Sequence, residues 1–103
     1  MSYREEVFMN ARVVRFTDVS PEQIDAVVTR VEESEGPPPG VESTAMKLFY
    51  DSDQGTAVFV AFFETEQQMR DADAIFQQMD ASDTPGTRAS IDRCEVKIER
   101  SAG

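Results

Sequence analysis

The chain has no histidine, no tryptophan and a single cysteine, and it carries only ten basic residues against twenty acidic ones. Without histidine it lacks the side chain that most often acts as acid or base near neutral pH. With Cys94 as its only cysteine it cannot form an internal disulfide. These absences narrow the catalytic chemistry that is open to the chain, and whether it is an enzyme stays undecided at this stage.

The shortage of basic residues gives a net charge of −10. Contacts to phosphates need clustered Lys and Arg, so this charge disfavours nucleic acid and anionic membrane surfaces as partners. No apolar run approaches the roughly 20 residues of a membrane-spanning helix. Residues 1–6 also lack the basic start and apolar stretch of a signal peptide. We therefore expect a cytoplasmic protein without a membrane partner.

Motifs for cofactors and metals are missing as well. The sequence has no glycine-rich phosphate loop. Asp51 and Asp53 suggest a calcium loop, but such a loop needs glycine at its sixth position and glutamate at its twelfth. Thr56 and Phe62 stand there instead. We expect these aspartates to form a turn, and we expect no metal and no cofactor.

The length of 103 residues predicts one domain over residues 1–103. Alternating or apolar stretches predict four strands, at about residues 8–16, 42–50, 56–63 and 89–99. Two helices are predicted from capping-box signatures, Ser20 with Gln23 and Thr65 with Gln68. The apolar stripes of these helices are Ile24, Val27, Val28 and Val31, and Met69, Ala72, Phe76 and Met79.

This β-α-β-β-α-β order predicts an α+β, ferredoxin-like fold. Its antiparallel sheet has four strands in the order 4-1-3-2, with both helices on one face. The strand at residues 56–63 is apolar on both faces. The helices cover one of these faces, and we expect a second copy of the chain to cover the other, which makes a homodimer.

The pattern resembles the dimeric α+β barrel superfamily, in particular small uncharacterised members related to antibiotic-biosynthesis monooxygenases. The segments that carry the resemblance are residues 11–16, 47–55 and 62–69. The resemblance implies two ferredoxin-like subunits packed through their open sheet faces. Members of the superfamily perform cofactor-free oxygenation, haem degradation or lactone isomerisation. This chain lacks the histidine of the haem-degrading members and the tryptophan that several members place near the substrate.

The strand alternation also gives a candidate ligand site. We expect Ala11 and Val13, Met46, Leu48 and Tyr50, and Cys94, Val96 and Ile98 to face the helices, with Cys94 buried. For the third strand, the resemblance implies that Phe63 looks into the barrel. Asp71 and Asp73 are assigned to a solvated helix face. The predicted ligand-binding residues on the open sheet face are Arg12, Lys47, Phe49, Phe59, Phe63 and Arg93.

Aromatic walls with a few cations favour a small aromatic or anionic ligand. The opposing interpretation is that Arg93 and Lys97 pair with Glu95 or Glu99 across the dimer. Three functions remain open: a ligand-binding barrel, a cofactor-free monooxygenase in which Arg12 or Arg93 holds a substrate anion, and a stress-related module whose acidic helix faces bind a basic protein.

Overall fold

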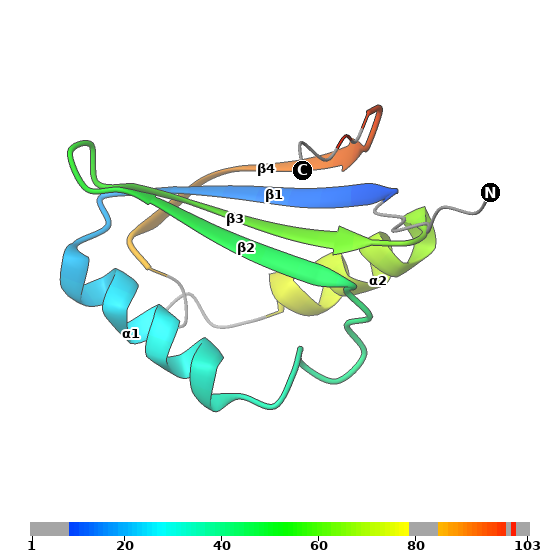
Figure 1. The fold of residues 1–103 in the computed structure, drawn as a ribbon, viewed down its shortest axis with the longest axis horizontal. Coiled ribbons are helices and arrows are strands. Elements are labelled where there is room, and N and C mark those ends of the chain that lie inside the picture. Colours follow the sequence, from blue (N-terminus) through cyan, green and yellow to red (C-terminus); the bar gives the residue numbers. More distant parts are fainter. Residues whose placement is uncertain (1–8, 79–84, 99, 101–103) are drawn as a thin grey trace.

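A computed structural model describes residues 9–78, 85–98 and 100 of the chain. The described part forms six elements in β-α-β-β-α-β order (Figure 1): β1 (Asn10–Thr17), α1 (Pro21–Glu33), β2 (Ala45–Asp51), β3 (Thr56–Phe63), α2 (Glu66–Gln77) and β4 (Thr87–Glu95). The order and type of the predicted elements are confirmed. The predictions that fall on Phe8, Met79 and Glu99 lie outside the described residues.

Within these residues the strands form one antiparallel sheet in the order β2-β3-β1-β4, which is the predicted order read from the other edge. Both helices lie on the same side of this sheet (Figure 1). The arrangement is ferredoxin-like, as expected for two β-α-β units laid side by side. The apolar strand β3 therefore occupies a central position, between β1 and β2.

Both helices begin at the predicted capping boxes. The Ser20 hydroxyl accepts from the backbone N–H of Gln23, whose side chain accepts from the backbone N–H of Ser20. Thr65 and Gln68 make the same reciprocal pair at the start of α2. Each box satisfies two backbone donors that have no partner inside the helix. The helix starts are thus fixed by local sequence.

In the described part of the chain, the core consists of two clusters, one beneath each helix. The first joins Val14, Phe16 and Ala57 of the sheet to Ile24 at the start of α1. The second joins sheet residues to the stripe of α2 and contains Val41, Ala61, Phe63, Met69 and Ala72. The clusters show which face of each strand meets the helices.

The predicted facing is correct for one strand and wrong for three. In β2, Leu48 packs against the cluster beneath α1 and the Tyr50 hydroxyl donates to the carbonyl of Val19, as predicted for the helix side. In β1 the helix side carries Arg12, Val14 and Phe16, not Ala11 and Val13. Both faces of this strand have apolar residues, and the larger pair, Val14 and Phe16, takes the core.

The third strand is also reversed. Phe59 and Phe63 pack on the helix side, so Val58, Val60 and Phe62 occupy the open face. The physical reason lies in the pairing of neighbours: Phe59 stands opposite both Val14 and Leu48, so all three side chains share one face. A strand that is apolar on both sides takes its orientation from its neighbours, not from its own alternation.

The reversal extends to β4. Arg93 stands opposite Arg12 and faces α2, whereas Cys94 stands opposite Ala11 on the open face and is exposed. The expectation of a buried Cys94 is therefore wrong for the single chain. The cause is an ion pair between Arg93 and Asp73 of α2. This pair holds Arg93 on the helix side, although the apolar residues of the strand, such as Cys94, alternate in the opposite sense.

Candidate functional site

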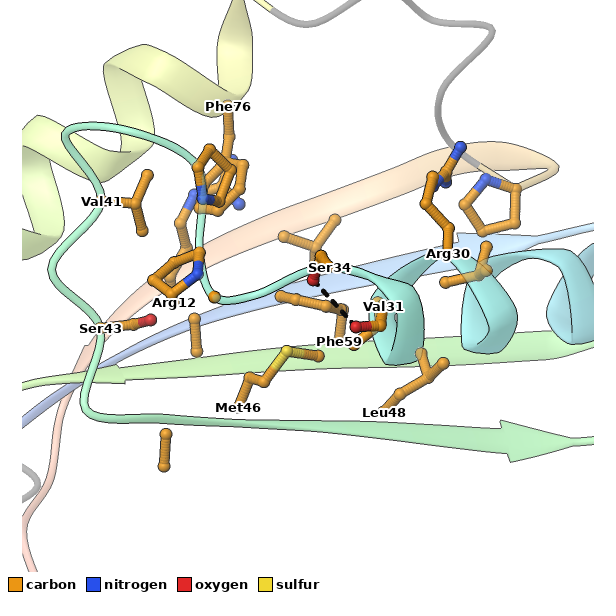
Figure 2. A pocket seen from close by; sticks show the side chains of 18 of the residues that line it. Arg12, Arg30, Val31, Ser34, Val41, Ser43, Met46, Leu48, Phe59 and Phe76 are labelled. Carbon is orange, nitrogen blue, oxygen red and sulfur yellow. Dashed lines mark hydrogen bonds between the residues drawn. The ribbon is translucent and has the colours of Figure 1, made fainter.

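A cavity of about 750 Å³ lies between the sheet, the C-terminal half of α1 and the segment that follows it (Figure 2). Its sheet side includes Val14, Leu48 and Phe59, and its helix side includes Val27 and Val31. It exists because α1 meets the core closely only near its start, through buried Ile24, while Val31 remains 38% exposed. The volume is in the range of small-molecule sites.

The proline-rich segment after α1 forms a second wall. Pro37, Pro38 and Val41 line the cavity, and the Val41 N–H donates to the Pro38 carbonyl. Gly40 has a φ of +88°, and a Cβ at this position would lie 2.7 Å from the side chain of Ile75 in α2. Glycine thus allows the segment to turn and to approach α2 closely. The wall is held by α2 and by its own backbone.

Arg12 forms part of the cavity wall and is only 4% exposed. Its Nε donates to Oδ1 of Asp73 in α2 at 2.7 Å. Its guanidinium carbon lies 4.8 Å from the ring centre of Phe76, in a cation–π contact. Among the described residues, the buried Nη2 of Arg12 has no hydrogen-bond partner. A buried donor without a partner is costly, so this atom marks a point where a ligand group is chemically favoured.

Asp73 receives donors from three side chains. Besides Arg12 at Oδ1, its Oδ2 accepts from Nε and Nη2 of Arg93 at 2.9 and 2.7 Å, and from Gln77 at 3.0 Å. Burial alone would raise the pKa of Asp73, but the hydrogen bonds and charges of Arg12 and Arg93 outweigh this and hold its pKa below the ordinary value. The carboxylate is therefore ionised at neutral pH.

The resulting cluster has two positive charges, on Arg12 and Arg93, and one negative charge, on Asp73. Among the described residues that line the cavity, Arg30 and Arg88 add further cations and Glu35 is the one acidic side chain. A chain with a net charge of −10 thus surrounds its cavity with positive charge. Such a field favours anions over cations in the cavity.

The six predicted site residues separate into distinct environments. Arg12 and Phe59 line the cavity, and Arg93 is joined to Arg12 through Asp73. Phe63 is fully buried in the core beneath α2. Lys47 and Phe49 lie on the opposite face of the sheet. The cavity is therefore on the helix side of the sheet, whereas the candidate site was predicted on the open face.

The opposing interpretation paired Arg93 and Lys97 with Glu95 or Glu99 of a second copy, and within the single chain both side chains already have a carboxylate partner. Arg93 pairs with Asp73, and Lys97 pairs with Glu95 in an exposed contact of 2.9 Å.

The two aspartates at the connection between β2 and β3 form a turn, as predicted. Oδ1 of Asp51 accepts from the backbone N–H of Asp53 and of Gln54. This is the hydrogen-bonding pattern of a turn.

Sequence reasoning missed Asp73 by assigning it to the solvated face of α2. A signal was available in the spacing. Asp73 follows Met69 by four residues and precedes Phe76 by three, which places it on the same stripe as these apolar side chains. An acidic residue within a buried stripe calls for a basic partner, and the sheet offered Arg12 and Arg93.

Within residues 9–78, 85–98 and 100, no three or more acidic or cysteine side chains gather as a metal site would require. In the same part of the chain, no helix is long and apolar enough to cross a membrane.

No protein-family model matches the chain, and no curated protein is similar to it in sequence. The ferredoxin-like fold therefore rests on the topology described above. This fold is compatible with the resemblance of three segments to the dimeric α+β barrel superfamily, and membership of that superfamily stays a prediction.

Proposed function

We propose that the protein binds a small aromatic or anionic molecule in the cavity between its sheet and α1. One observation carries this proposal: an apolar cavity of about 750 Å³ has in its wall the buried Arg12, whose Nη2 is unpaired among the described residues. Apolar walls with a few convergent polar groups are typical of small-molecule sites. A bound anion would provide the partner that Nη2 lacks.

Anilinonaphthalene sulfonate, an anionic aromatic dye, provides a direct test by fluorescence titration. Val31→Trp adds a bulky ring to a side chain that lines the cavity, so it should weaken dye binding several-fold. Val28→Trp is the matched control, because Val28 lies on the same helix, is 39% exposed and is not part of the cavity lining. The proposal fails if the folded protein binds no dye, or if both variants bind it as the wild type does.

A cofactor-free monooxygenase is the second candidate, and the same arginine favours it. In this reaction the substrate anion itself reacts with oxygen, and a fixed cation lowers the energy of the charged species. Arg12 is fixed by Asp73 and Phe76 and could hold such an anion. Oxygen uptake with quinols, measured for the wild type and for Arg12→Gln, tests this reaction. Uptake that depends on Arg12 would make the protein an enzyme.

We further propose a homodimer joined through the open sheet face. Val13, Phe49, Val58 and Val60 lie on this face, and Phe49 is 53% exposed. Covering this apolar surface with a second copy is favourable by roughly 25 cal/mol per Å². A two-fold interface must be self-complementary. The face carries both signs of charge, on Lys47 and Asp92, so two copies can satisfy each other.

A further inference from the structure

The cluster of Arg12, Asp73 and Arg93 carries one uncompensated positive charge beside an apolar cavity. We propose that this cluster selects ligands with one negatively charged oxygen group on an apolar body, as in an aromatic monocarboxylate. Asp73 is the positioning residue that turns the Arg12 guanidinium for this contact. The inference rests on the proposed function, because it concerns the ligand of the same cavity.

The charge balance supports a monoanion. Asp73 already compensates one of the two arginines, and a single anion compensates the other. A neutral ligand would leave the net positive charge of the cluster unbalanced beside an apolar cavity, which is unfavourable. The other cations of the described lining lie farther along the cavity, Arg88 opposite Phe16 and Arg30 on α1, so the three side chains of the cluster set the charge balance at Arg12. One oxyanion is therefore the best match to the three charged side chains.

The geometry explains how the contact is made. Nε of Arg12 is occupied by Oδ1 of Asp73, and one face of the guanidinium lies over Phe76. These two contacts fix the plane of the group and leave Nη2 as a donor without a partner among the described residues. Because Nη2 is also closed off from solvent, binding includes a small shift of the wall around Arg12. Figure 2 shows Arg12 and Phe76 together at one end of the cavity.

The strand that carries Arg12 indicates the shape of the apolar body of the ligand. Val14 and Phe16 follow Arg12 at alternate positions of β1 and line the same cavity. With a rise of about 3.3 Å per residue, the apolar path from Arg12 to Phe16 extends roughly 13 Å. Phe59 and Leu48 border this path on the neighbouring strands. A body of two fused rings with its acid group at Arg12 suits this path.

Isothermal calorimetry with three naphthalene probes of similar shape tests the selection. We expect the wild-type protein to bind naphthoate at least about tenfold more tightly than neutral naphthamide, because a charge-assisted hydrogen bond replaces a neutral one. Naphthalene dicarboxylate should bind no more tightly than naphthoate, because the cluster balances one anion. Equal affinity for naphthoate and naphthamide would overturn the charge selection and leave the cavity proposal standing. If none of the probes binds, the proposed function itself fails.

Variants assign the selection to the cluster. Arg12→Gln should reduce the preference for naphthoate over naphthamide to about twofold or less. Arg93→Gln removes the surplus charge at a side chain that is 39% exposed, so it should lower the same preference even if Arg12→Gln does not fold. Arg70→Gln, in an exposed pair with Glu66, is the matched control and should leave the preference unchanged.

Asp73→Asn gives a readout that a merely structural role would not produce. This variant leaves both arginines without their carboxylate, so the cluster carries two positive charges. The preference should then move from naphthoate toward the dicarboxylate. An Asp73→Asn protein that stays folded and keeps the wild-type order of affinities would overturn the role of Asp73 in the charge selection.

Discussion

Nε of Arg12 in β1 donates to Oδ1 of Asp73 in α2 at 2.7 Å, across 61 residues of sequence. The other oxygen of the same carboxylate binds Arg93 of β4. One side chain of α2 is thus tied to two neighbouring strands, which holds this helix over them. The other helix meets the sheet through Ile24 near its start, and the cavity opens beneath its far end. The cavity forms because α2 is held to the sheet by Asp73, whereas α1 contacts the core closely only near its start.

The first prediction concerns the pH dependence of stability. The pKa of Asp73 is lowered by folding, so its contribution to stability is fully present above its unfolded pKa, about 3.9, and is lost as the pH falls toward the lower folded pKa. We expect the free energy of unfolding to decrease more steeply below about pH 4 in the wild type than in Asp73→Asn. Urea denaturation at a series of pH values measures both slopes.

Asp71→Asn is the control for this experiment. Asp71 lies on the same helix, is exposed and accepts a hydrogen bond from the side chain of Gln67. Its replacement should leave the acid dependence close to that of the wild type. If Asp73→Asn and Asp71→Asn have the same acid dependence, Asp73 does not stabilise the fold through its ionised form.

The second prediction concerns Gly86, which has a φ of +56° just before β4. A Cβ there would collide with the backbone carbonyl oxygens of Thr17 and Asp18, which cannot move aside without breaking the end of β1. Gly55 also has a positive φ, +66°, but a Cβ would be 3.4 Å from its nearest neighbour. Gly55→Ala should cost about 1–2 kcal/mol from backbone strain alone. Gly86→Ala should cost about 1–3 kcal/mol more because of the collision.

Chemical denaturation of the two variants compares these costs directly. Equal destabilisation by Gly86→Ala and Gly55→Ala would mean that the end of β1 yields to the added methyl group. Both variants carry the same substitution at positions of similar φ. The difference between their free energies of unfolding therefore measures the cost of the collision, apart from the cost of backbone strain.

The third prediction concerns the capping boxes. Ser20→Ala and Thr65→Ala each remove the side-chain oxygen that accepts from the first turn of a helix. Each should lower the free energy of unfolding by about 1 kcal/mol. Thr29→Ala, at an exposed position inside α1, is the control and should be neutral or slightly stabilising, because alanine is the better helix former. Thermal unfolding followed by circular dichroism provides the measurement.

The features that the sequence predicted well are those decided locally. Ser20 and Thr65 cap their helices, Asp51 makes its turn, and the order of elements then leaves few ways to arrange the sheet. The facing of the strands is not local. In β3 both faces are apolar, and the choice depends on which side chains of β1 and β2 stand opposite Phe59.

The candidate site was predicted only in part for the same reason. Arg12 and Phe59 do line a cavity, but they reach it from the face opposite to the predicted one. The alternation of β1 was interpreted with Ala11 and Val13 toward the helices, which placed Arg12 on the open face. The burial of Arg12 depends on its ion pair with Asp73, which is distant in sequence. Such a pair can be predicted only when the periodicity of β1 and that of α2 are considered together.

The final prediction tests the proposed dimer. Phe49 is 53% exposed on the open sheet face, and Phe49→Glu places a charge where a second copy would pack. Val28→Glu is the matched control, since Val28 is an exposed apolar residue on α1, on the other side of the sheet. At micromolar concentration, sedimentation should show a dimer for the wild type and Val28→Glu, and a monomer for Phe49→Glu.

Cys94 offers an independent reading of the same interface. It is the only cysteine of the chain and is exposed on the open face, opposite Ala11. If a second copy covers this face, a thiol reagent should modify Cys94 more slowly at high protein concentration than at low concentration. In Phe49→Glu the rate should be fast and independent of concentration. A wild-type protein that sediments as a monomer, with Cys94 equally reactive at every concentration, would contradict the dimer and leave the cavity on the helix side as a site formed within a single chain.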